Sequence, residues 1–177
     1  FNKEIVNALK DQSCKTRRIT SKEYNVITVK PESDKLGFVG TPTHIKTNVL
    51  KEIIKANEVP VVAPLGLDKN NQTFNINADT VAGSIAKELR ARRLMIISDV
   101  EGVLDDEKKL ITEIDTGEAK RLIDQEIISG GMIPKINNCL DVASNGVKGV
   151  VIIDGRKNHS LLFELLSDKG SGTLIRE

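Results

Sequence analysis

Short apolar segments alternate with amphipathic segments along most of this chain. Unbroken apolar runs, which predict buried strands, occur at 24–30, 60–65, 94–100 and 149–155. Apolar residues recur at helical spacing over 43–57, 79–93, 116–127, 133–146 and 159–168. Buried strands separated by amphipathic helices are typical of a largely parallel sheet that helices cover on both faces. The pattern therefore predicts an α/β fold.

One segment changes from a strand pattern to a helix pattern within a few residues. It reads FNINADTVAGSIAKEL (74–89) and carries Asn75, Asn77 and Asp79 at alternate positions. Either Asn77 or Asp79 could be the helix N-cap, whose side chain accepts a bond from a backbone amide. One cap needs only one such residue, and small residues at 82–84 leave room beside the first turns. Because a helix N-terminus favours negative charge, the segment predicts a site for an anion or a polar ligand.

Polar residues also follow two of the predicted strands. LMIIS leads into Asp99 and Gly102, and VVII leads into Asp154 and Gly155. In sheets of this kind, ligands bind beyond the carboxyl ends of the strands. An aspartate at a strand end can equally close a turn or cap a helix, so each aspartate alone leaves both roles open.

Composition and charge narrow the range of partners. The chain has 177 residues, the size of about one domain, and its 26 basic and 25 acidic side chains leave a net charge of +1. This balance predicts neither a nucleic acid nor a membrane partner. The basic run CKTRR (14–18) is predicted to be a solvated surface patch, because aromatic residues make up only 3% of the chain.

The cysteines and the apolar runs indicate a cellular compartment. Cys14 and Cys139 stand far apart, without histidines at ligand spacing, which predicts two reduced thiols and neither a disulfide nor a zinc site. No apolar run approaches the roughly 20 residues that a membrane-spanning helix needs, and no signal peptide opens the chain. We therefore expect a cytoplasmic protein.

Four motifs follow one another in a fixed order, and together they are more specific than any one of them. They are FNINADTVAG, ISDVEGVLDD, ISGGMIPKI and IDGRKNHSLLFELLSDKGSGTLI. From about Leu36 to the C-terminus the sequence resembles the acetylglutamate kinases, a branch of the amino acid kinase family. The resemblance implies a three-layer α/β sandwich with a mainly parallel sheet. It also implies a cytoplasmic enzyme of arginine biosynthesis that phosphorylates the side-chain carboxylate of N-acetyl-L-glutamate with ATP.

The same resemblance implies roles for individual residues. Asn75 would contact the acetylated substrate, Asp79 would organise the catalytic lysines, and Lys135 would stabilise charge on the transferred phosphoryl group. Mg²⁺ would be carried by the ATP phosphates, with no metal ligand from the protein. The nucleotide would contact two segments, made of Asp99, Val100, Glu101, Gly102, Val103 and Leu104 and of Ile127, Ile128 and Ser129.

Local sequence supports a fixed position for Lys135. A solvated lysine at a helix start is the alternative, but Gly130, Gly131 and Pro134 predict a tight turn that fixes the backbone there. The nearby segment DDEKK (105–109) is predicted to be an exposed hairpin or loop tip and to have no catalytic role.

Some family features are absent from the 177 residues. The strand with a first catalytic lysine, the glycine-rich loops and the substrate-gripping arginine do not occur, and segment 14–25 differs from the glycine-containing stretch of relatives. We therefore expect a single-domain portion of a longer enzyme that is inactive alone. In this interpretation 1–35 belongs to the amino-acid-binding half and 36–177 is the nucleotide-binding half. The full-length enzyme is expected to be a homo-oligomer, either a dimer or a hexamer.

The segment HSLLFELLSDKGSGT (159–173) resembles the part of arginine-sensitive relatives that holds the feedback inhibitor arginine. His159 and Glu164 are predicted to lie near one helix face, and Gly170 would let the backbone approach the ligand. Glu164 is expected to anchor the guanidinium. An ordinary C-terminal amphipathic helix remains the alternative. Two other functions compete with acetylglutamate kinase. One is a non-catalytic regulatory module that binds a nucleotide or arginine, and the other is a different amino acid kinase.

Overall fold

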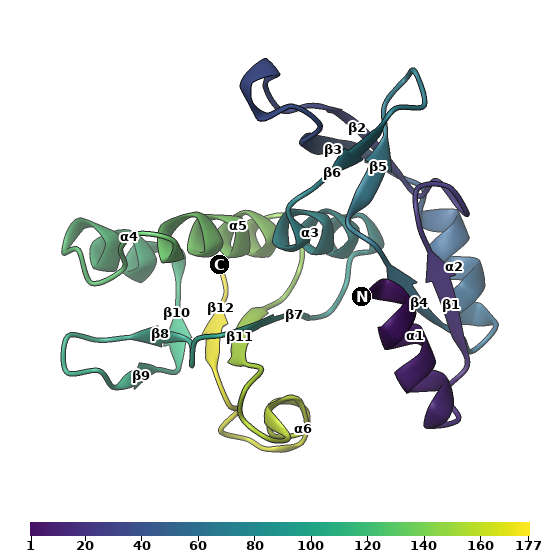
Figure 1. The fold of residues 1–177 in the computed structure, drawn as a ribbon. Helices are drawn as coiled ribbons and strands as arrows, with labels where there is room; N and C mark the ends of the chain where they lie inside the picture. The colour runs from purple at the N-terminus through teal and green to yellow at the C-terminus, as the bar shows by residue number, and fades with distance from the viewer. The chain divides into compact units, whose positions relative to one another are not determined.

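The computed structural model describes residues 1–177, which form two compact units, Phe1–Glu88 and Leu89–Glu177 (Figure 1). The two units meet in sequence at the end of one helix, α3 (Ala78–Leu89). The boundary between the two units is set by the contacts that residues make within each unit. The functional division at 35/36 predicted from the sequence stays a prediction.

The first unit combines two small sheets with three helices. A parallel pair joins β1 (Thr16–Ile19) to β4 (Val59–Val62), and α1 (Asn2–Asp11) packs on both strands. The second sheet has the order β3-β2-β5-β6. Its strands are β2 (Ile27–Pro31), β3 (Gly40–Ile45), β5 (Leu65–Leu67) and β6 (Thr73–Asn75), while η1 (Asp34–Leu36) and α2 (Thr47–Lys55) complete the unit together with α3.

Burial in the first unit follows the helical and strand periods. Leu50 and Ile53 of α2 are buried at helical spacing, and α2 packs on β4. The helix predicted from residue 43 starts too early, because 43–45 belong to β3, where Ile45 pairs with Ile27. Thr43 and His44 are exposed and Ile45 is buried, so pairing with β2 sets the strand conformation here and not a helical period of burial. The predicted surface run 14–18 overlaps β1 at residues 16–18, and Arg17 and Arg18 are exposed on that strand.

The second unit is built on a four-stranded sheet of order β10-β12-β11-β7. Figure 1 shows α4 and α5 on one face of this sheet and α6 on the other. The bounds are β7 (Leu94–Ser98), β8 (Val103–Leu104), β9 (Leu110–Ile111), β10 (Glu113–Ile114), α4 (Thr116–Asp124), α5 (Met132–Ser144), β11 (Val150–Asp154), α6 (Ser160–Leu166) and β12 (Thr173–Ile175).

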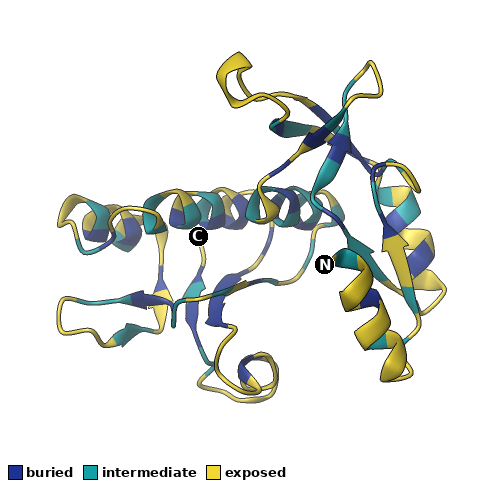
Figure 2. Cartoon of the chain, in the orientation of Figure 1, coloured by how far each residue is buried: buried dark blue, intermediate teal, exposed yellow.

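The core of the second unit lies around β11. All five residues of β11 are buried, whereas α6 is mostly exposed (Figure 2). The two strands predicted at 94–100 and 149–155 pair in parallel, with Val150 opposite Leu94 and Asp154 opposite Ser98. The predicted α/β class is therefore confirmed. The antiparallel partner of β11 is β12, a strand that the sequence patterns did not predict.

Helix ends differ from the predictions by a few residues. The helix predicted over 79–93 stops at Leu89, and Arg90 has a positive φ of 50°. The helix predicted over 116–127 stops at Asp124, shortly before Glu126 with a φ of 59°. A left-handed residue ends the helical hydrogen-bond pattern at both places. No helix in either unit has the length and apolar character needed to cross a bilayer.

Candidate functional site

The strand-to-helix segment lies in the first unit and confirms one of the two predicted caps. Asn77 Oδ1 accepts a hydrogen bond from the Thr80 amide at 3.1 Å, so Asn77 is the residue that caps α3. Phe74 and Ile76 are buried, and Asn75 between them is exposed. Asp79 is half-buried in the first turn of α3. With the cap supplied by Asn77, the exposed amide of Asn75 is left available for a ligand.

Lys135 lies in the second unit, in the first turns of α5. The turn before it is tight, as predicted, because Gly130 has a φ of 53° and the Met132 amide donates to the Ser129 carbonyl at 3.1 Å. No side chain caps α5, and a Cβ added to Gly130 or Gly131 would have no atom within 4 Å. The uncapped N-terminus of a helix attracts anions, and open space at the two glycines leaves it accessible.

The two predicted nucleotide segments also lie in the second unit, but not all of their side chains are accessible. Ile128 and Val103 are both 2% exposed and belong to the core. Asp99 and Ser129 are exposed, and Glu101 and Ile127 are half-buried. Only the accessible members can use their side chains toward a ligand. The buried side chains of Val103 and Ile128 hold in place the backbone that carries the accessible residues.

Arg156 and Lys157, which the sequence patterns did not indicate, stand beside the loop Asp99–Leu104. Arg156 donates to Asp154 through Nε and Nη2, each at 2.9 Å, and its amide donates to the same carboxylate. These bonds hold the pKa of Asp154, which is 3% exposed, down at about 2. The hydrogen bond to Asp154, with a smaller effect of Asp99 and Glu101, raises the pKa of Arg156.

Two contacts join the loops after β7 and β11. The Gly155 amide donates to the Ser98 carbonyl at 2.8 Å, and Lys157 Nζ lies 2.8 Å from Glu101. Arg156 and Lys157 therefore offset two carboxylates on a loop that is predicted to meet phosphates. The sequence contained a signal for this, because parallel strand ends bring together the loop with Asp99 and Glu101 and the loop with Arg156 and Lys157.

The C-terminal segment forms a hollow of about 410 Å³ in the second unit, lined in part by Arg93, Glu164 and Gly170. Glu164, 8% exposed, accepts from the Arg93 guanidinium at 3.3 Å and from the Ser171 amide at 2.9 Å. His159 does not line the hollow. It is exposed and precedes α6 with a φ of 61°. The predicted common helix face of His159 and Glu164 is therefore wrong, because His159 lies before α6 in a left-handed conformation and is not part of the helix.

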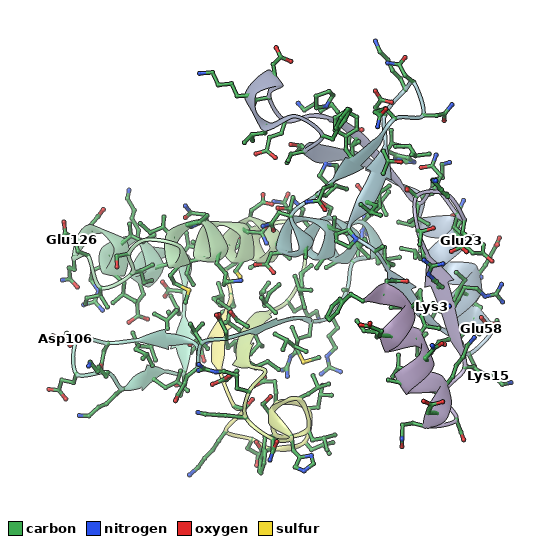
Figure 3. All side chains as sticks on the ribbon, viewed as in Figure 1. Lys3, Lys15, Glu23, Glu58, Asp106 and Glu126 are labelled. Carbon is green, nitrogen blue, oxygen red and sulfur yellow. The ribbon has the colours of Figure 1, made fainter.

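A larger hollow of about 1040 Å³ lies beside α1 and β1, and no predicted site residue lines it. Figure 3 shows Lys3, Lys15, Glu23 and Glu58 around it. Its two carboxylates are already paired, because Glu58 receives two hydrogen bonds of 2.8 Å from Arg17 and Glu23 lies 3.3 Å from Arg18.

Comparison with known proteins identifies the relationship. The sequence profile described as the amino acid kinase family matches residues 1–154. The chain belongs to the amino acid kinase family.

Individual members of the amino acid kinase family match the whole chain. The acetylglutamate kinase of Pelagibacter ubique is 78% identical over 177 residues, which are 100% of this chain and 62% of that protein. The acetylglutamate kinase of Nitrobacter hamburgensis is 42% identical over 190 residues, covering 100% of this chain and 64% of that protein. The chain therefore spans less than two thirds of the length of these relatives.

A solved structure supports the same fold. The crystal structure of smu.665 from Streptococcus mutans is similar with a TM-score of 0.82 and 28% identity, over 98% of this chain and 66% of that one. The amino acid kinase fold expected from the motifs is confirmed by this likeness together with the family match.

Proposed function

We propose that the protein is an acetylglutamate kinase of arginine biosynthesis, acting in the cytoplasm as a homo-oligomer. The observation that carries this proposal is the 78% identity to the Pelagibacter ubique acetylglutamate kinase along the entire chain. In the reaction, a side-chain carboxylate oxygen of N-acetyl-L-glutamate attacks the γ-phosphorus of ATP. The bond from that phosphorus to the bridging oxygen breaks, which gives an acyl phosphate and ADP.

Three residues are assigned to the acceptor and to the transfer. Asn75 presents an exposed amide that can bond the acetylated substrate. Asp79 stands in the first turn of α3 and organises cationic groups of the site. Lys135 supplies positive charge to the phosphoryl oxygens, whose charge must be stabilised during transfer. Phosphoryl transfer depends on such alignment and neutralisation more than on covalent chemistry by the protein.

ATP is assigned to the second unit. The uncapped start of α5 and the accessible members of Asp99–Leu104 and Ile127–Ser129 offer amides and polar side chains for phosphates, ribose and base. Gly130 and Gly131 have open space where a Cβ would be, which suits the approach of a bulky phosphate group. Mg²⁺ is assigned to the ATP phosphates, where it neutralises charge with water completing its shell.

The decisive experiment is a trapping assay on the complete gene product. With Mg-ATP and N-acetyl-L-glutamate, added hydroxylamine should convert the acyl phosphate to a hydroxamate, which ferric ion makes visible as a coloured complex, with ADP released in equal amount. N-Acetylglutamine, which has an amide in place of the reacting carboxylate, is the matched negative substrate. Hydroxamate formed from aspartate or free glutamate, but not from N-acetylglutamate, would instead support another amino acid kinase.

A regulatory role is favoured by one observation in the second unit. Glu164 keeps a buried carboxylate beside a hollow of about 410 Å³ and already receives a guanidinium, that of Arg93. A guanidinium ligand can exploit the same carboxylate through paired hydrogen bonds. We assign this hollow to the feedback inhibitor arginine, anchored by Glu164 with Gly170 beside it. His159 is outside the hollow and has a peripheral role at most.

The arginine assignment is tested with two neighbouring substitutions. Glu164→Gln removes the anionic carboxylate, and Arg93→Gln removes its partner but leaves the carboxylate in place. Glu164→Gln should raise the arginine concentration for half-inhibition by about tenfold or more without abolishing turnover, the loss expected for a charged hydrogen bond. Arg93→Gln should leave inhibition intact or strengthen it. Equal inhibition curves for both variants, or a wild type insensitive to millimolar arginine, would count against the site.

A further inference from the structure

A single buried hydroxyl joins the two strands of the β8–β9 hairpin to the central sheet. Thr173 of β12 is 0% exposed, and its Oγ1 accepts a hydrogen bond of 2.8 Å from the Val103 amide. The same hydroxyl donates to the Ile111 carbonyl at 2.7 Å. Val103 and Ile111 are opposite one another in the hairpin. Thr173 thus fixes both strands at the point where the loop Asp99–Leu104 becomes a strand.

The backbone next to this contact is adapted to it. Gly102 is buried with a φ of 142°, a conformation that side chains rarely permit. A Cβ at Gly102 would lie 2.5 Å from Thr173 Oγ1 and 3.1 Å from the Thr173 amide nitrogen. The loop can therefore reach the hydroxyl only because residue 102 has no side chain.

The other end of the loop is fixed independently. The Ser98 carbonyl accepts from the Gly155 amide at 2.8 Å, and the register of β7 and β11 holds Ser98 opposite Asp154. The accessible part of the loop, with Asp99 and Glu101, is therefore fixed at both of its ends. One anchor is backbone pairing to β11, and the other is a side chain on β12.

We propose that Thr173 is a positioning residue for nucleotide binding, and this rests on the nucleotide role proposed above for Asp99–Leu104. Thr173 is completely buried and acts on the ligand only through the Val103 amide and the loop before it. A loop held at both ends loses less conformational entropy on binding a nucleoside triphosphate than a loop held at one end. The hydroxyl therefore contributes to nucleotide affinity without touching the nucleotide.

The test compares Thr173→Val with Thr173→Ser in the complete gene product. Valine keeps the size but removes the hydroxyl, which leaves the Val103 amide buried without its partner, whereas serine keeps the hydroxyl. Calorimetric titration with ADP should show affinity reduced about tenfold by Thr173→Val and retained within about twofold by Thr173→Ser. Turnover at saturating ATP should change much less than the KM for ATP, since the chemical step is not contacted.

A separate variant controls for general loss of stability. Ile152→Val shortens a wholly buried side chain of β11, should lower the melting temperature, and should leave ADP affinity unchanged. Hydrogen exchange at the Val103 amide should accelerate in Thr173→Val and not in Ile152→Val. ADP affinity that Thr173→Val retains, or that Ile152→Val reduces equally, would overturn the role of Thr173. Absence of nucleotide binding by the wild type would instead overturn the proposed function, and this inference with it.

Discussion

Replacing Gly172 with alanine should lower the free energy of unfolding of the second unit by about 3 kcal/mol or more. A Cβ at this buried position would overlap the backbone carbonyl oxygen of Ile152 and lie 2.9 Å from both the Ile152 carbonyl carbon and the Ile153 Cγ2. Ile152 lies in the centre of β11, where the sheet hydrogen bonds fix its carbonyl. The new methyl group can fit only if the two strands separate locally.

Urea unfolding followed by circular dichroism measures this loss. Gly131→Ala is the matched control, because residue 131 has a negative φ of −67° and a Cβ there would meet no atom within 4 Å. Its free energy of unfolding should stay within about 0.5 kcal/mol of the wild type. A Gly172→Ala protein as stable as Gly131→Ala would show that the chain from 171 to 173 does not approach β11 as described.

Replacing Lys135 with alanine should lower turnover about 100-fold or more while changing nucleotide affinity much less. The proposed role of Lys135 is to stabilise charge that develops only as the phosphoryl group moves between the two oxygens. An interaction made in the transition state and not in the ground state appears in kcat and leaves the dissociation constant nearly unchanged. Steady-state kinetics and calorimetry on the same preparation give both quantities.

An exposed lysine of the same unit provides the comparison. Lys120 lies on the exposed side of α4, so Lys120→Ala removes the same charge from the unit without altering the start of α5. It should leave both turnover and affinity close to the wild type. If Lys135→Ala instead weakens nucleotide binding as much as it lowers turnover, Lys135 is a ground-state contact and the phosphoryl-transfer role is refuted.

The sequence predicted those elements whose burial pattern is local. The strands at 94–98 and 150–154 are continuous apolar runs, and their parallel pairing follows from the helices between them. Asn77 was one of the two predicted caps for α3, because a cap bonds an amide three residues away. The turn at Gly130 and the exposed loop 105–109 were predicted for similarly local reasons.

Features that depend on distant residues could not be predicted in the same way. β12 is three residues long, too short for a periodic pattern, and its position comes from pairing with β11. Arg93 and Glu164 are 71 residues apart, and Thr173 bonds an amide 70 residues earlier. The motif resemblance placed Thr173 in the C-terminal segment. In the structure, the hydroxyl of Thr173 forms its hydrogen bonds with the β8–β9 hairpin.

The β8–β9 hairpin also offers a practical means of observing the loop in solution. Its tip at Asp106 is exposed, and its base is the segment assigned to the nucleotide (Figure 3). Cys139 is 0% exposed inside α5, so Cys14 is the thiol that a maleimide dye would reach. An Asp106→Cys protein that also carries Cys14→Ser would accept one fluorophore at the far end of the hairpin. The anisotropy of that fluorophore would then follow the ordering of the loop during a titration, from a position that no ligand needs to touch.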